Sequence, residues 1–165
     1  MEDSIANMLR SKENQFCAKS FVDELRINNV SSLDLTARKI DDNSITVFAQ
    51  VLCMTDFLTS IDFGDNEIGD EGAKLLAQAL SVNTSITSIR LGCNKIAKEG
   101  AKALAEMLRV NKSINSIFLS SNEIGKEGTR SIAEVLRVNN TITSIYLSCN
   151  QLGNDGAKEL AETLR

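Results

Sequence analysis

A 28-residue repeat dominates this sequence and decides what the chain can fold into. The units 60–87, 88–115 and 116–143 follow one another without a gap, and a further unit begins at 144 and stops at 165. The preceding segment, 32–59, fits the same frame with weaker matches. A fixed period of this size is typical of a solenoid, in which each unit packs against its neighbours along one axis.

The hydrophobic period changes once within each unit. The first part alternates between apolar and polar side chains, as at Ile89, Arg90 and Leu91, which predicts a short strand with one buried face. The second part has helical spacing and predicts one buried stripe, formed in this unit by Ala101, Leu104, Ala105 and Leu108. Stacked units therefore predict an α/β solenoid, with parallel strands on one side and helices on the other.

Two strings carry the pattern LxLxxNxI, namely IRLGCNKI at 89–96 and IFLSSNEI at 117–124, and GxEGAxxLAxxL follows it. These strings resemble the leucine-rich repeat family, and the helical half is similar to the ribonuclease-inhibitor-like subclass. That subclass includes sensor regions of NOD-like receptors, the Ran GTPase-activating protein and many bacterial effectors. The resemblance covers residues 32–165. It implies a right-handed solenoid of five repeats, the last one incomplete, that forms a short horseshoe arc with the strands on the concave side and the helices on the convex side. Such a solenoid serves mainly as a binding surface.

The resemblance also implies an inward ladder of asparagines, one in each of the last four units. Such side chains offer both a donor and an acceptor to the backbone of a buried turn. The first unit departs from this pattern, because Arg38 stands at the asparagine position. The expected ladder consists of Asn66, Asn94, Asn122 and Asn150.

The two ends of the chain lead to different expectations. Residues 1–31 are expected to form a helical N-terminal cap and half-repeat, because one stripe there matches the repeat helices: Ala18, Phe21, Val22 and Leu25. A segment around Ile5, Met8 and Leu9 is expected to fold over the open end. No polar cap follows the last unit, so we expect this end to be exposed and the chain to self-associate through it. The apolar side chains expected to be exposed there are Ile145, Leu147, Leu160 and Leu164.

Composition excludes several classes of function. The chain has no His, which removes the commonest general base and every Ser-His or Cys-His nucleophile. A net charge of −4 gives no electrostatic case for nucleic acid or an anionic membrane. No signal peptide or membrane-spanning run is visible, so we expect a cytoplasmic protein, or one in the host cytoplasm if it is a secreted effector. We expect no enzymatic activity, cofactor, metal or small-molecule substrate.

Cysteines and glycosylation sequons are explained by the repeat. Cys93 and Cys149 lie two units apart, beyond disulfide reach, and no C-x-x-C occurs, so free thiols are expected. Three of the four Asn-x-Ser/Thr sites recur at one position after the helix, where Asn suits a turn: Asn83, Asn111 and Asn139.

One outward column of the strands varies from unit to unit, and it runs Asp34, Asp62, Arg90, Phe118 and Tyr146. Aromatic residues and Arg are enriched in binding hot spots, and the chain has one Tyr and six Phe. The columns on either side are small, mostly Ser and Gly. We therefore predict a protein-binding patch centred on Arg90, Phe118 and Tyr146, with a polar rim of Asp62, Glu67, Lys95 and Glu123. The alternative is that Phe118 and Tyr146 form a stabilising cross-strand pair alone.

Three functions follow from these observations. The first is a non-catalytic module that binds a partner protein through its concave face and blocks an enzyme, as an inhibitor or a bacterial effector; the blocking role rests on the resemblance. The second is a regulatory protein of the Ran GTPase-activating type, for which no residues carry over. The third is a structural piece of a larger repeat receptor, or a dimer formed through the C-terminal unit.

Overall fold

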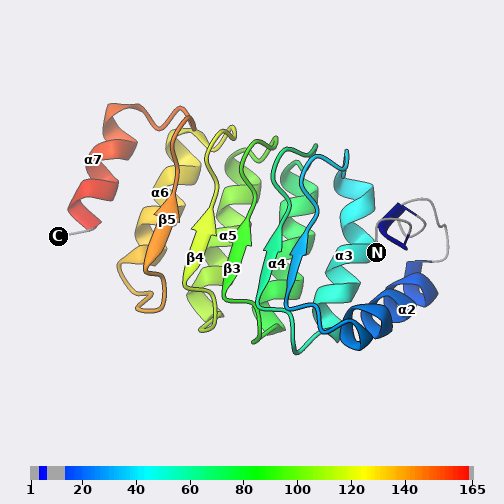
Figure 1. The fold of residues 1–165 in the computed structure, drawn as a ribbon. Coiled ribbons are helices and arrows are strands. Elements are labelled where there is room, and N and C mark those ends of the chain that lie inside the picture. The colour runs from blue at the N-terminus through cyan, green and yellow to red at the C-terminus, as the bar shows by residue number, and fades with distance from the viewer. Residues whose placement is uncertain (1–3, 7–13, 164–165) are drawn as a thin grey trace.

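The computed structural model describes residues 4–6 and 14–163 and consists of two curved layers, one of strands and one of helices (Figure 1). The five strands are three residues long and parallel, in the order β1-β2-β3-β4-β5. They are β1 (Ser32–Asp34), β2 (Ser60–Asp62), β3 (Ser88–Arg90), β4 (Ser116–Phe118) and β5 (Ser144–Tyr146). Their register pairs residues 28 positions apart, such as Ser60 with Ser88. The predicted α/β solenoid is thereby confirmed.

One helix follows each strand and lies behind the sheet. The helices that follow the strands are α3 (Asp42–Met54), α4 (Asp70–Val82), α5 (Lys98–Val110), α6 (Gly125–Leu136) and α7 (Gly153–Thr163), and α2 (Asn14–Ile27) precedes the first strand. Each packs against the next helix along the chain, from α2 to α7. Figure 1 shows that the helices begin at one edge of the solenoid and end at the opposite edge, where each loop leads into the next strand.

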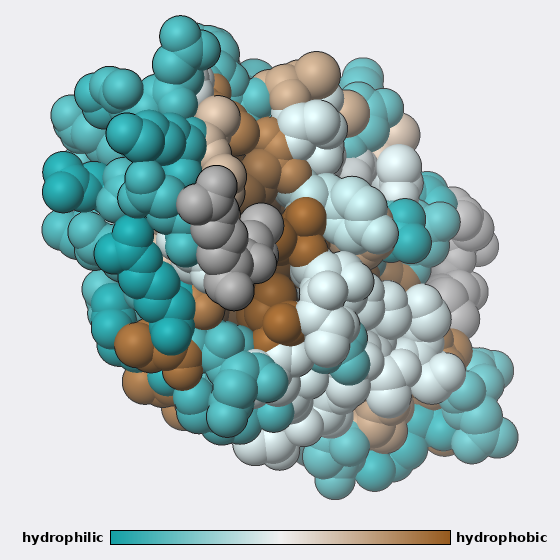
Figure 2. Space-filling view, turned by 90° about the vertical axis from the view of Figure 1, so that its left-hand side faces the viewer, coloured by the Kyte–Doolittle hydropathy of each residue, from teal (hydrophilic) through white to brown (hydrophobic). Residues whose placement is uncertain are grey.

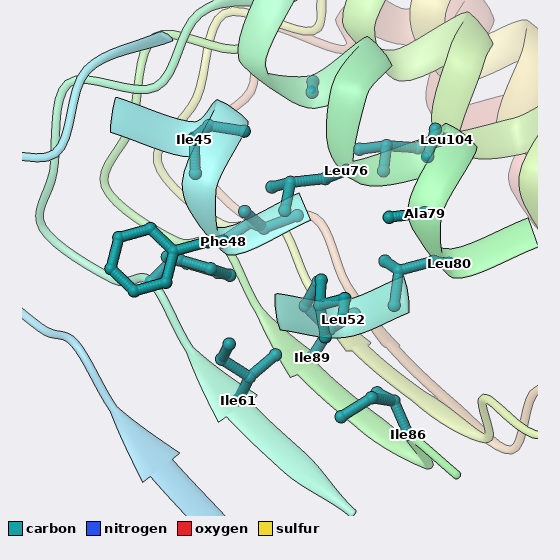
Figure 3. Packing of buried hydrophobic residues seen from close by; sticks show 14 of the residues in the cluster. Ile45, Phe48, Leu52, Ile61, Leu76, Ala79, Leu80, Ile86, Ile89 and Leu104 are labelled. Carbon is teal, nitrogen blue, oxygen red and sulfur yellow. The ribbon is translucent and has the colours of Figure 1, made fainter. Parts of the chain in front are cut away.

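The core fills the space between the two layers. Figure 3 shows Phe48 and Leu52 of α3 and Leu76 of α4 directed toward Ile61 and Ile89 of the sheet. All five side chains are fully buried. Burial of one such side chain contributes about 1.5–3 kcal/mol, so stacking of the repeats is the main source of stability.

Aspartates cap the N-termini of the helices in two ways, either on their own helix or on the helix of the next repeat. Asp41 caps its own helix α3, because its Oδ1 accepts a 2.9 Å hydrogen bond from the Ser44 backbone N–H. Asp70 instead caps the helix of the next repeat, because its Oδ1 accepts from the backbone N–H groups of Ala97 and Gly100, both at 2.8 Å. Capping across repeats ties successive helices together at their N-terminal ends.

The N-terminal helix α2 buries the stripe formed by Ala18, Phe21, Val22 and Leu25, and Ile5 is also buried. Met8 and Leu9 lie outside the described residues.

At the other end, Figure 2 shows a band of hydrophobic side chains between the hydrophilic helix surface and the paler strand surface. The expected exposure of these side chains is corrected here: Leu147 is buried, at 8% exposure, and Ile145 and Leu160 are half-buried. Leu147 is covered because the repeat before it packs on that side. Leu164 lies outside the described residues.

Candidate functional site

The predicted centre of the patch, Arg90, Phe118 and Tyr146, forms one continuous column across the sheet. Asp62, which was predicted for the rim, lies in the same column. The parallel register places Asp62 opposite Arg90, Arg90 opposite Phe118, and Phe118 opposite Tyr146. Each is the last residue of its strand and points away from the core, because the preceding Ile of each strand points inward. We call Asp62, Arg90, Phe118 and Tyr146 the concave column.

Contacts along the concave column are specific. The carboxylate Oδ2 of Asp62 lies 3.8 Å from Nε of Arg90. The guanidinium carbon of Arg90 lies 4.4 Å from the centre of the Phe118 ring, in cation–π geometry. The rings of Phe118 and Tyr146 are stacked, with centroids 4.1 Å apart and planes 5° from parallel. The column is therefore a stack of planar groups rather than a set of independent side chains.

The concave column is anchored at Asp62 and flanked by small residues. Asp62 is fixed at its base because its Oδ1 accepts a 2.8 Å hydrogen bond from the backbone N–H of Gly64. Small residues flank the column, including Ser116 and Ser120 beside Phe118. As a result Tyr146 is 48% exposed, and Phe118 is partly exposed.

The polar rim lies on the loops that follow the strands. Lys95 Nζ and Glu67 Oε2 form an ion pair at 2.9 Å across neighbouring repeats. The hydrogen bond from Lys95 to Glu67, with the nearby charges of Glu67 and then Glu123, raises the pKa of Lys95 above its ordinary value. Glu123 itself is exposed. The structure thus places Glu67, Lys95 and Glu123 along one line, at the loops rather than in the column.

The loops keep their shape through the buried asparagines Asn66, Asn94, Asn122 and Asn150. Each bonds its own loop and the preceding repeat. Asn94 is representative: its Oδ1 accepts from the Ile68 N–H at 2.9 Å, and its Nδ2 donates to the Phe63 carbonyl at 2.9 Å. The residue just before each asparagine adopts positive φ, for example Asp65 at 54° and Cys93 at 54°. These hydrogen bonds offset the cost of that conformation.

A second row of buried asparagines lies at the opposite edge, at Asn83, Asn111 and Asn139. Asn111 Nδ2 donates to the carbonyls of Leu80 and Asn83 in the preceding repeat, at 2.8 and 3.0 Å. Asn83 and Asn111 are helix C-caps with negative φ, so they are not the left-handed residues typical of helix ends. The sequence predicts only a turn at these positions. The recurrence of Asn every 28 residues is the signal that could have revealed a second ladder.

The described residues hold little else that is suited to chemistry. In the ranges 4–6 and 14–163, no group of three His, Cys, Asp or Glu side chains is placed to hold a metal ion. Cys53, Cys93 and Cys149 are free and exposed, and the side chain of Cys17 lies outside the described set. No helix in this part of the chain is both long and apolar enough to cross a membrane.

Comparison with known proteins identifies the repeat. A family model described as Leucine Rich repeat matches residues 57–77, 82–105 and 138–161, less than half of the chain. The chain therefore contains leucine-rich repeats. No curated protein matches the sequence.

Two solved structures share the fold over nearly the whole chain. One is the leiomodin-1 region titled Actin-Binding Site 2, at 19% identity and TM-score 0.70, covering 87% of this chain and 88% of that one. The other is the tropomodulin C-terminal domain from Caenorhabditis elegans, at 14% identity and TM-score 0.72, covering 89% of this chain and 90% of that one. At these identities the likeness concerns the fold.

Proposed function

We propose that this protein is a non-catalytic interaction module that binds a partner protein through its concave column. The observation that supports this most is the stack of Arg90, Phe118 and Tyr146, which exposes an aromatic and cationic surface on a rigid sheet. Arg and aromatic residues dominate binding hot spots, and a surface fixed before binding loses little conformational entropy on association.

The rim supports specificity rather than affinity. Glu67, Lys95 and Glu123 are exposed and screened by solvent, so each contributes little binding free energy. Charges in such positions fix the register of a partner and raise its association rate. The proposal therefore assigns affinity to the concave column and orientation to the rim.

The proposal has two more specific parts. The first is that the concave surface blocks the partner by covering one of its functional regions. The second is that the chain belongs to the ribonuclease-inhibitor-like subclass. The 28-residue repeat with its long helical half supports the subclass. The open strand layer supports the blocking mode, because helices α3 to α7 lie behind it and leave its outer face accessible to a partner (Figure 1).

The test is a capture experiment followed by a direct affinity measurement. Wild-type protein is used to capture partners, and the captured protein is then titrated against an Arg90→Ala, Phe118→Ala, Tyr146→Ala variant. A matched control replaces three exposed residues of one convex column, Lys102→Ala, Arg130→Ala and Lys158→Ala. Circular dichroism verifies that both variants are folded.

The proposal predicts a loss of about a hundredfold or more in affinity for the concave variant, since each hot-spot residue contributes roughly 1–2 kcal/mol, and near wild-type affinity for the convex control. Equal binding by all three proteins would refute it. Because of the fold shared with a leiomodin-1 region titled for actin binding, actin filaments are included as one defined probe.

A further inference from the structure

A row of exposed aliphatic side chains runs along the edge of the solenoid where the helices end. Ile27, Met54, Val82 and Val110 are the last residues of α2, α3, α4 and α5, and Val138 lies two residues beyond α6. They are 79%, 40%, 69%, 58% and 62% exposed, respectively. We call these five residues the aliphatic row; the edge on which they lie is the lower one in Figure 1.

The row accounts for nearly all large apolar side chains that the described residues expose. The one other is Tyr146, which belongs to the concave column. Single exposed aliphatic residues scattered over a surface are normal, whereas an aligned set marks an interaction surface. This alignment is a consequence of the repeat, because Met54, Val82, Val110 and Val138 stand at one repeat position, 28 residues apart, and Ile27 lies one residue after the equivalent position.

The spacing of the row points to the shape of its partner. Adjacent packed helices have axes about 8–10 Å apart, so successive members of the row are separated by a similar distance. Seven residues of an α-helix extend about 10.5 Å. A helix laid across the ends of α2 to α6 would therefore present an apolar side chain to each member of the row at heptad spacing.

The charges beside the aliphatic row indicate which charge the flanks of the partner helix carry. Lys112 and Arg137 lie next to Val110 and Val138, at the negative ends of two helix dipoles. Lys112 donates to the Arg109 carbonyl, and Arg137 donates to the Thr163 hydroxyl. Among the described residues no carboxylate pairs with either cation, so both are available to an acidic partner.

We propose that the aliphatic row is a second protein-binding surface, independent of the concave column, and that it binds an amphipathic helix with apolar residues at heptad spacing and acidic flanks. Binding buries the aliphatic row against the apolar face of the helix. The acidic residues of the helix lie against Lys112 and Arg137.

The test uses a displayed library of helical peptides of about 28 residues, long enough to span the row at 1.5 Å per residue. Leucine is fixed at heptad positions and the remaining positions are randomised. Selection is carried out against wild-type protein, with counter-selection against a Val82→Ser, Val110→Ser, Val138→Ser variant. A Val82→Leu, Val110→Leu, Val138→Leu variant is the matched control, because it keeps the positions apolar.

The proposal predicts enriched peptides with acidic flanks that bind wild-type and Leu variants similarly. Their affinity for the Ser variant falls by about tenfold or more, because the buried methyl groups are lost. The Arg90→Ala, Phe118→Ala, Tyr146→Ala variant still binds them, which distinguishes this surface from the concave column. Failure to enrich any peptide over the counter-selection, or equal binding by the Ser variant, would overturn the proposal.

Discussion

The rings of Phe118 and Tyr146 stack face to face, 4.1 Å between centroids, because the register of β4 and β5 places the two residues directly opposite each other. Arg90 covers the other face of Phe118 at 4.4 Å. Stacking of this kind stabilises the sheet whether or not a partner binds, so its contribution to stability must be separated from its contribution to recognition.

A double-mutant cycle measures the stabilising part. Phe118→Leu, Tyr146→Leu and the double variant keep apolar bulk but remove the stacked rings. We expect a coupling free energy of about 0.5–1.5 kcal/mol from denaturant unfolding, the range for aromatic pairs. Additive effects would mean that the two rings do not stabilise each other in solution.

Replacing one asparagine of the loop ladder should destabilise the fold strongly. Asn94→Ala leaves the Ile68 N–H without its acceptor in a buried turn and removes the donors to neighbouring carbonyls. We expect the free energy of unfolding to fall by about 2–4 kcal/mol. Asn115→Ala is the control, because that side chain is exposed and should change stability by less than about 0.5 kcal/mol. Similar values for both variants would contradict the buried role of Asn94.

Helix packing depends on the absence of a side chain at Gly100. A Cβ built there would lie 2.7 Å from Asp70 Oδ1 and 2.9 Å from Cβ of Ala73. Gly100→Ala should therefore cost about 1–3 kcal/mol, through overpacking and loss of the cap from Asp70. Gly92→Ser serves as the control, since Ser120 and Ser148 occupy the same repeat position. If Gly92→Ser lowers the midpoint of thermal unfolding more than Gly100→Ala does, this account is wrong.

The stability of the chain should decrease in acid, and Asp41 should contribute. Hydrogen bonds from the Ser44 hydroxyl and then its backbone N–H lower the pKa of Asp41 below its ordinary value. A lowered folded-state pKa means that the stabilisation is complete above the unfolded pKa, about 3.9, and is lost as the pH falls through the folded value.

Asp41→Asn retains an acceptor at the N-cap but cannot titrate. Its free energy of unfolding should therefore depend less steeply on pH below about 4 than that of the wild type. Parallel curves for the two proteins, measured by urea unfolding across this range, would exclude a contribution from Asp41.

The solenoid was predictable because the 28-residue period places an alternating segment and a helical segment in every unit. The same period fixed the order Asp62, Arg90, Phe118, Tyr146, because parallel strands of identical units pair in register. The stacked geometry was not predictable, since side-chain torsions depend on neighbours in space.

Two other features escaped prediction for different reasons. The sequence predicts a turn at Asn111 but does not reveal its bonding partners, the carbonyls of Leu80 and Asn83, because they lie in the preceding repeat. Val82 and Val110 resembled core residues by type, and only the position of the helix ends reveals that they are exposed. Both features depend on where one repeat lies against the next.

The most direct test of the concave column uses its single tyrosine. Tyr146 is the one Tyr in the chain, so incorporation of 3-fluorotyrosine gives a single ¹⁹F signal from this site. The signal is followed while the captured partner is added to saturation, with the Lys102→Ala, Arg130→Ala, Lys158→Ala variant as a parallel sample. The account predicts that the chemical shift of the resonance changes in both samples as the complex forms, whereas broadening alone would reflect only the slower tumbling of a larger complex. A chemical shift that stays unchanged while the partner is fully bound would contradict it.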